Sequence, residues 1–363
     1  MARKVFIAAT GQNSGKTTTS LSLVHLARKV YGRVGFIKPL GPKPVAYGDL
    51  VVDKDAAVMA EVFGLQEDIG SMSPLVLHPG MTKKVLDGEI SRQELEDRIV
   101  KAGRILDEKY DFLVIEGSGH SGVGSVIGLS NARIAQLLDA PVMIICGGGV
   151  GNAIDAVSLN LAMFRQQGVA VKLVMANKII PEKRIATLHY LNQAFAGAEF
   201  PIFGGFNYSP ILANPTLGRI AKILDRPLRG DYGDGTRIIH HVQLATASSQ
   251  RVIDLLDDSA LLLVNSTRDE LLVTLSSLYH LPEYYARIAG LVVPGLQPVS
   301  KITQKILDDS RIPYIRTEIT NAAAFTIIKD DVSKITAEDT EKIELIESLA
   351  ESELDFAAID ALL

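Results

Sequence analysis

The chain has 363 residues, 47% of them hydrophobic, and a formal net charge of -5 at neutral pH. This hydrophobic content suffices for a substantial core and the length favours two domains, whereas the lack of Lys and Arg runs among aromatic residues argues against nucleic acid as a partner. The first apolar run is far shorter than the ~20 residues of a membrane span, and the single cysteine excludes an internal disulfide, so we expect a cytoplasmic protein without a membrane partner.

The most informative segment lies at the start of the chain, where an apolar run at residues 5–9 leads into a loop and then an amphipathic helical pattern. The loop and the first helical turn comprise Thr10, Gly11, Gln12, Asn13, Ser14, Gly15, Lys16, Thr17 and Thr18. This order is typical of a phosphate loop, in which backbone N–H groups surround an oxyanion at a helix N-terminus. We expect Lys16 to reach the β and γ phosphates of a nucleoside triphosphate and Thr17 to bind Mg²⁺. The loop is a variant, because the strict pattern has glycine where Thr10 stands.

Further apolar runs of strand length alternate with helical patterns, at residues 34–37, 112–115, 142–145, 171–176 and 202–206. Continuous apolar strands that alternate with helices predict an α/β fold with a parallel sheet covered on both faces. Ligands bind such sheets at the carboxyl ends of the strands. The polar residues that follow the runs, Lys38, Glu116 and Asn177, are therefore candidates for function.

Two carboxylates are candidate Mg²⁺ ligands beside the Thr17 hydroxyl, because Mg²⁺ prefers hard oxygen donors. Glu116 follows the apolar run at residues 112–115, and Asp55 is the second candidate. The neighbouring Asp53 fits a ligand role equally well, or serves as a helix N-cap. Lys38 precedes a proline at the same sheet edge, where it could neutralise charge in a phosphoryl transfer or simply lie in solvent. Lys16 and Lys38 are thus the candidate catalytic residues.

Asn177 follows a strand at a position where an amide can pair with the edge of a nucleobase. Ile180 stands where a guanine-reading motif has aspartate, which favours ATP over GTP. Cys146 ends an apolar run and is expected in the core. His120 lies near the turn after Glu116 and has no evident partner.

A glycine-rich, charged passage at residues 227–235 predicts a domain boundary, which gives domains at 1–227 and 231–363. The second domain has strand-like runs at 238–244, 261–265 and 288–293, helical patterns at 249–256, 270–279, 299–308 and 321–328, and a helical tail at 340–363. Its adjacent His240 and His241 point to opposite faces of a predicted strand, which is unsuited to shared metal ligation.

About the first 225 residues resemble dethiobiotin synthetase and the N-terminal half of long bacterial phosphotransacetylases. The resemblance rests on residues 10–18, 35–39, 55–56, 114–117 and 174–177. It implies that Lys16 and Lys38 contact phosphates and substrate and that Asn177 reads adenine. It also implies that Thr17, Asp55 and Glu116 bind Mg²⁺, and that the protein is a homodimer or larger.

The remainder resembles the DRTGG domain at residues 267–269 and 294–296. In phosphotransacetylases this domain joins the P-loop half to the acetyltransferase half and is regarded as regulatory. The resemblance implies a Mg·ATP-binding regulator with slow hydrolysis, without the acetyltransferase domain, and with a small-molecule or protein partner at its second domain. Substrate positions of the synthetase differ here at residues 9–11, at 40–43 and at Gly149. The alternative is an ATP-dependent ligase that forms an acyl- or carbamoyl-phosphate on another substrate.

Overall fold

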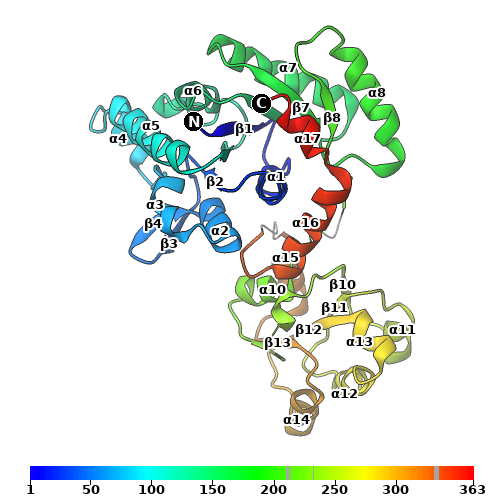
Figure 1. Cartoon of the computed structure of the whole chain (residues 1–363). Helices are drawn as coiled ribbons and strands as arrows, with labels where there is room; N and C mark the ends of the chain where they lie inside the picture. The colour runs from blue at the N-terminus through cyan, green and yellow to red at the C-terminus, as the bar shows by residue number, and fades with distance from the viewer. Residues whose placement is uncertain (210–211, 213, 232, 331–334) are drawn as a thin grey trace. The chain divides into compact units, whose positions relative to one another are not determined.

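The computed structural model describes residues 1–209, 212, 214–231, 233–330 and 335–363. The chain divides into two compact units (Figure 1): unit 1 comprises Met1–Ser209 and Ile343–Leu363, and unit 2 comprises Pro210–Lys342. This division differs from the boundary expected at 227–231, because the helix before that point packs in the core of unit 2 and the C-terminal helices pack in unit 1. In the described part of the chain, no helix is long and apolar enough to cross a membrane.

Unit 1 is built on the expected parallel sheet, with six strands in the order β2-β5-β1-β6-β7-β8. The strands are β1 (Arg3–Ala9), β2 (Val34–Ile37), β5 (Phe112–Glu116), β6 (Val142–Cys146), β7 (Val171–Ala176) and β8 (Ile202–Gly204). Every residue of β2, β5 and β6 is buried. Burial on both faces explains why these strands are continuous apolar runs rather than alternating ones.

The helices of unit 1 lie between and after these strands. They are α1 (Lys16–Ala27), α2 (Lys54–Phe63), α3 (Ile69–Met72), α4 (Met81–Leu86), α5 (Arg92–Lys109), α6 (Asn131–Leu137), α7 (Val150–Gln166) and α8 (Arg184–Ala194), with single 3-10 turns at Gln66–Asp68, Ser125–Ile127 and Pro181–Lys183. A short antiparallel hairpin of β3 (Pro44–Tyr47) and β4 (Leu50–Asp53) follows β2. This hairpin is not among the elements expected from the sequence.

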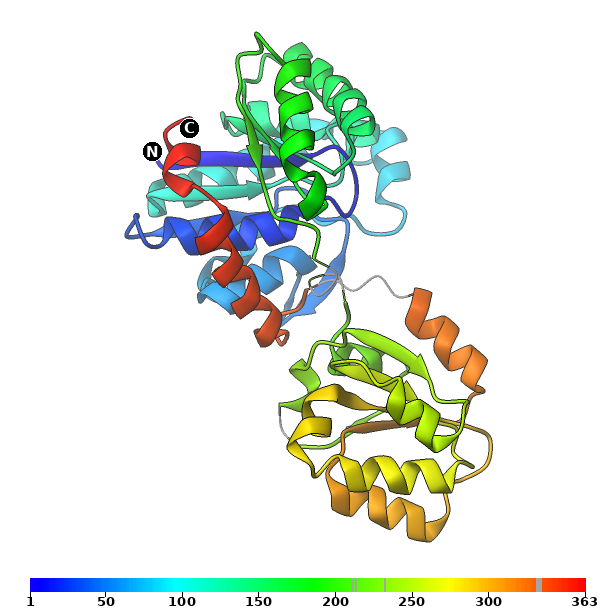
Figure 2. The same ribbon diagram turned by 90° about the vertical axis from the view of Figure 1, so that its right-hand side faces the viewer.

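Two C-terminal helices, α16 (Thr340–Glu353) and α17 (Phe356–Asp360), lie beside α1 (Figures 1 and 2, red). Asp360 Oδ1 is 2.8 Å from Arg3 Nε, and the Phe356 ring lies 5.7 Å from that of Phe112. Helix α1 is consequently buried almost all round from its second turn onward. It is therefore not the amphipathic helix that the sequence predicted, because chain from the other end of the protein covers its outer side.

Unit 2 has a second, smaller sheet with the strand order β10-β11-β12-β13-β9, in which only β9 is antiparallel to its neighbour. Its strands are β9 (Leu228–Arg229), β10 (His241–Leu244), β11 (Ala260–Leu263), β12 (Ile288–Pro294) and β13 (Tyr314–Thr317). Its helices are α10 (Leu217–Ile223), α11 (Ser249–Asp254), α12 (Asp269–Leu278), α13 (Pro282–Arg287), α14 (Lys301–Ser310) and α15 (Asn321–Asp330), with a 3-10 turn at Asp234–Thr236.

Each face of this sheet carries its own apolar core. Along β11, Leu262 belongs to the cluster that contains Leu275 of α12, whereas Leu261 belongs to the cluster that contains Ile220 of α10. Successive residues of a strand point to opposite faces, so both faces are covered. Unit 2 is thus a complete α/β domain with its own core.

Candidate functional site

The glycine-rich loop connects the central strand β1 to the N-terminus of α1. Gly15 precedes the helix in a left-handed conformation with φ of 97°, and a Cβ there would lie 2.3 Å from Asn177 Nδ2. Only glycine therefore fits at this position. The first N–H groups of α1 are left for an anion, as expected of a phosphate loop.

Lys16 folds back over the loop. Its Nζ donates hydrogen bonds to Gly11 O at 3.3 Å and to Gly119 O at 3.0 Å, where Gly119 belongs to the loop after β5. Burial lowers the pKa of Lys16 to about 8, although attraction by Glu116 opposes this effect. The Lys16 ammonium is thus paired with two neutral carbonyl oxygens. Charged phosphate oxygens would be stronger partners for it.

Asn177 ties the loop to the neighbouring strands. The side chain is 2% exposed, its Nδ2 donates to Ser14 O, and its Oδ1 accepts from the N–H of Phe206, both at 2.9 Å. Lys178 Nζ also donates to the loop, to Asn13 O at 2.6 Å. Asn177 therefore positions the loop directly.

Glu116 lies at the end of β5 beneath the start of α1, and its side chain is 1% exposed. It accepts hydrogen bonds from Ser20 Oγ at 2.8 Å and from Thr17 Oγ1 at 3.3 Å, and Lys38 Nζ lies 2.7 Å away. The structure thus brings together Thr17, Glu116 and Lys38, as the sequence predicted for the carboxyl edge of the sheet.

Asp55 joins this cluster from the first turn of α2. Its carboxylate is 3.1 Å from Lys38 Nζ and 3.4 Å from Lys43 Nζ. Burial alone would raise the pKa of Asp55, but the two ammonium groups hold it well below its usual range. The same carboxylates, Glu116 and Asp55, hold the pKa of Lys38 above its usual value despite burial. Asp55 and Lys38 therefore form a charged pair at neutral pH.

Asp53 has the capping role that was the alternative to ligation. Its Oδ1 accepts the N–H of Asp55 at 2.9 Å as the N-cap of α2, and its Oδ2 accepts the N–H of Lys43 at 3.0 Å. Burial and the charge of Asp55 raise the pKa of Asp53. Both carboxylate oxygens of Asp53 accept hydrogen bonds from backbone N–H groups. Asp53 therefore orients Asp55 and Lys43 and does not face the cluster.

The donor set fits a Mg²⁺ ion that arrives with a nucleotide. Among the described residues, no group of three or more His, Cys, Asp and Glu side chains could hold a metal ion. The cluster instead offers one hydroxyl, from Thr17, and two carboxylates, from Asp55 and Glu116. Mg²⁺ in nucleotide sites is usually held by one or two carboxylates, with phosphate oxygens and water completing the octahedron.

Three residues of the site were not predicted. Ser20 lies one helical turn after Thr17 on the same face of α1, and this spacing could have revealed it. Asn131 is fully buried and supports the loop after β5, because its Oδ1 accepts the N–H of Ser118 and its Nδ2 donates to Ser118 O. Lys43 reaches the cluster only because the β3–β4 hairpin pairs Pro44 with Asp53. No local sequence signal marks Asn131 or Lys43.

The remaining candidates lie apart from the cluster. Cys146 is fully buried at the end of β6, and burial raises the pKa of its thiol to about 11. His120 is exposed, and its Nδ1 accepts the N–H of Gly122 at 3.2 Å. His241 starts β10 in unit 2, and His240 precedes it. Gly149 caps α7 with φ of 97°.

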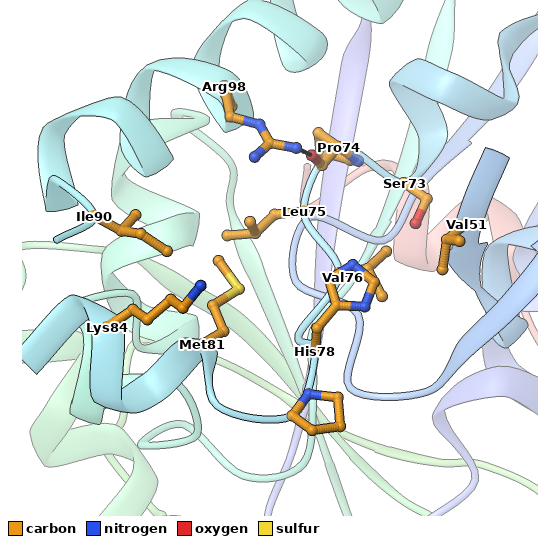
Figure 3. A pocket seen from close by; sticks show the side chains of 11 residues that line it. Val51, Ser73, Pro74, Leu75, Val76, His78, Met81, Lys84, Ile90 and Arg98 are labelled. Atoms are coloured by element: carbon orange, nitrogen blue, oxygen red, sulfur yellow. Dashed lines mark hydrogen bonds between the residues drawn. The ribbon is translucent and has the colours of Figure 1, made fainter.

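A pocket of about 340 Å³ lies against the segment that follows α3 (Figure 3). Its lining includes Val51, residues 73–76 and three basic side chains, and none of the described lining residues is acidic. Figure 3 shows Lys84 and Arg98 extending from α4 and α5 into the space around Leu75, and Arg98 Nη2 donates to Pro74 O at 2.8 Å.

Hydrogen bonds connect this pocket to the charged cluster. Ser73, which lines the pocket, accepts the N–H of Asp53 on its Oγ at 2.8 Å, and Met72 O accepts the N–H of Lys38 at 2.8 Å. The segment after α3 is thus the shared wall between the pocket and the cluster.

The loop between a central parallel strand and a helix, with lysine, hydroxyl and acidic groups at its mouth, defines a P-loop NTPase domain joined to a second α/β domain. Residues 3–216 match the family model AAA_26, described as an AAA domain, and the chain belongs to this family.

Curated relatives agree with this assignment. The chain is 24% identical over 299 residues to phosphate acetyltransferase of Synechocystis sp., which covers 81% of this chain and 42% of that protein. It is 22% identical over 364 residues to phosphate acetyltransferase of Nitratidesulfovibrio vulgaris, covering 98% and 51%. It is 25% identical over 179 residues to ATP-dependent dethiobiotin synthetase BioD of Methanocaldococcus jannaschii, covering 48% and 79%. The predicted resemblance to dethiobiotin synthetase and to the N-terminal half of phosphotransacetylases is confirmed. The chain spans about half the length of the phosphate acetyltransferases or less.

Proposed function

We propose that unit 1 binds Mg·ATP and that the protein is a nucleotide-dependent regulator with slow ATP hydrolysis. The observation that carries this proposal is the convergence of Thr17, Asp55, Glu116 and Lys38 at the head of α1, directly beside Lys16 of the loop. A triphosphate with its metal would meet hydroxyl and carboxylate ligands on one side and ammonium groups on the other. These are the contacts that bind a charged nucleotide and stabilise the γ-phosphate.

The magnesium ion, when bound, would polarise the phosphate oxygens. Thr17, Asp55 and Glu116 would hold the ion, whereas Lys16 and Lys38 would balance the charge that develops on the phosphates. Asn177 would keep the loop in its binding conformation and read adenine. We infer a preference for ATP over GTP, which competition between the two nucleotides in calorimetry tests.

A regulatory role is supported by the presence of unit 2, with its own two apolar cores, in a chain that matches phosphate acetyltransferases along nearly its whole length. Residues 9–11, 40–43 and Gly149 differ from the synthetase at positions that serve its substrate, while the nucleotide positions are kept. We therefore propose that unit 1 binds ATP and that unit 2 binds an unidentified small-molecule or protein ligand.

We also infer that the protein is a homodimer or larger, as the resemblance to dethiobiotin synthetase implies. Multi-angle light scattering at micromolar concentration tests this inference. A mass of about twice 39.2 kDa is expected, and a monomer alone would contradict it.

An ATP-dependent ligase is the second candidate function, and the basic pocket favours it. A carboxylic acid with an apolar body would match the lining of Leu75, Val76 and Met81 and the charges of Lys84 and Arg98. In such a reaction the carboxylate oxygen attacks the γ-phosphorus, the bond to ADP breaks, and ADP leaves. An amine then attacks the carbonyl carbon of the acyl phosphate, which forms an amide and releases inorganic phosphate and a proton.

Phosphate and ADP release separates the two functions. The regulator predicts slow release that a panel of carboxylic acids, with and without ammonia, leaves unchanged. Strong stimulation by one acid, lost in Arg98→Gln but kept in the surface variant Arg104→Gln, would establish the ligase and reject the regulator.

A further inference from the structure

The Lys38 ammonium occupies the point where the two acidic side chains of the site meet. Its Nζ lies 2.7 Å from Glu116 Oε1 and 3.1 Å from Asp55 Oδ2, and it donates to Gly117 O at 3.2 Å. The Lys38 side chain is only 3% exposed. An ammonium has three N–H groups, so Lys38 is fully paired without any ligand.

This position is the one that a divalent metal would need. A Mg²⁺ ion bound by Asp55 and Glu116 would lie about 2.0–2.1 Å from an oxygen of each carboxylate. An ammonium at hydrogen-bonding distance from the same two carboxylates leaves no room for the ion, and the two positive charges repel each other. Lys38 and the metal therefore exclude each other between these carboxylates.

Departure of Lys38 requires a new anionic partner, since a buried ammonium without one is strongly destabilised. A free divalent ion brings no such partner. A nucleotide triphosphate brings both the metal and the oxygens to which the released ammonium could bind. The exchange is thus favourable only when metal and phosphate arrive together.

We propose that Lys38 is the resident counter-cation of the empty site, which keeps divalent metal out until nucleotide phosphate arrives and then exchanges places with the metal. The proposal rests on the nucleotide-binding function above and adds an order of binding to it: the metal enters with the nucleotide and not before it.

The test is Mn²⁺ binding to the full chain in the absence of nucleotide, measured by calorimetry and by the shift of the thermal unfolding midpoint. Wild-type protein should show no saturable binding up to millimolar Mn²⁺. Lys38→Met, which leaves the two carboxylates without their counter-cation, should bind Mn²⁺ at least tenfold more tightly and unfold at a markedly higher temperature when Mn²⁺ is present. If the variant folds poorly alone, added Mn²⁺ should restore its cooperative unfolding.

Two further variants serve as controls. Lys101→Met removes an exposed ammonium on α5, outside the site, so it should behave like wild type. Lys38→Met combined with Glu116→Gln should lose the Mn²⁺ effect. Saturable Mn²⁺ binding to the wild-type empty site, or a Lys38→Met variant that Mn²⁺ neither binds nor stabilises, would overturn the proposal. Failure of the wild type to bind ATP would instead reject the proposed function, because the Mn²⁺ measurements contain no nucleotide.

Discussion

Glu116 is a buried carboxylate whose two oxygens are shared among Ser20, Thr17 and Lys38. Glu116→Gln keeps its size but removes the charge that would hold Mg²⁺. We expect the Mg²⁺ concentration for half-maximal ATP binding to rise by roughly tenfold or more, the loss seen when even an outer partner of a metal is changed. Nucleotide affinity at saturating Mg²⁺ should change less.

Calorimetric titration of Mg²⁺ at fixed ATP measures this effect, with Glu108→Gln on the exposed side of α5 as the control. A normal Mg²⁺ requirement together with lost nucleotide binding would refute the ligand role of Glu116.

Asn177 pairs two buried backbone groups, Ser14 O and the N–H of Phe206. Asn177→Ala leaves both without a partner, and an unsatisfied buried group costs about 1–3 kcal/mol. We expect a loss of about 2–6 kcal/mol in the free energy of unfolding, since two such groups lose their partner, and a smaller difference between ATP and GTP affinities. Urea denaturation and competition calorimetry measure the two effects, with the surface variant Asn192→Ala as the control. If the free energy of unfolding and the preference for ATP over GTP are both unchanged, Asn177 neither supports the loop nor reads the base.

At the residue scale, the sequence predicts the polar groups that follow strands and misses those that reach the site through distant packing. Thr17, Glu116 and Lys38 were predictable because the ends of parallel strands and the loop helix meet at one sheet edge. From the sequence, Asp55 and Asp53 were equally plausible metal ligands. The hydrogen bond from the N–H of Asp55 to Asp53 Oδ1 gives Asp53 the capping role and leaves Asp55 as the candidate ligand. Asn131 and Lys43 act through tertiary pairing that no local pattern encodes.

At the scale of single elements, a substitution in helix α17 tests whether packing of the C-terminal segment stabilises unit 1. Phe356 is 8% exposed and packs on Phe112 of β5. Phe356→Ala should reduce the free energy of unfolding of unit 1 by about 3 kcal/mol, as expected for a buried phenylalanine.

Urea denaturation measures this loss. Glu351→Gln on α16 is the control, because Glu351 is exposed and its ion pair with Lys29 lies at the surface, where such pairs contribute little. Equal stability of Phe356→Ala and wild type would contradict the packing of α17 against unit 1.

The strands of unit 1 follow their predicted ranges closely, since buried parallel strands are continuous apolar runs bounded by polar residues. Residues 34–37 and 171–176 match β2 and β7, whereas the expected strand at 202–206 ends at Gly204. The hairpin of β3 and β4 was missed because each strand has only four residues and most of them are exposed or half-buried. In unit 2, β13 was missed, and β10 begins three residues later than expected.

For the whole molecule, a regulatory role requires that unit 2 alter nucleotide binding by unit 1. Residues 1–209 linked to 343–363 by a flexible linker of roughly 12 Gly and Ser residues, about 17–21 Å in mean reach, should fold because they contain all of unit 1. A chain that ends near residue 225 would lack α16 and α17.

We expect the ATP affinity of this linked unit to differ from that of the full chain by roughly 5–150-fold, the range of typical couplings of ~1–3 kcal/mol. Calorimetry on both proteins measures the difference. Identical binding and hydrolysis, with and without added cell extract, would remove the basis for regulation and favour the ligase.

Calorimetry with ATP on the full chain, with and without Mg²⁺, tests the nucleotide site most directly when wild type is compared with Lys16→Ala. The substitution removes an ammonium from the loop and no contact of the apolar core, so thermal unfolding should be unchanged. We predict Mg²⁺-dependent binding of one ATP per chain to wild type and no measurable binding to Lys16→Ala. Equal ATP affinity of the two proteins, or no binding to either, would contradict a phosphate loop at residues 10–18.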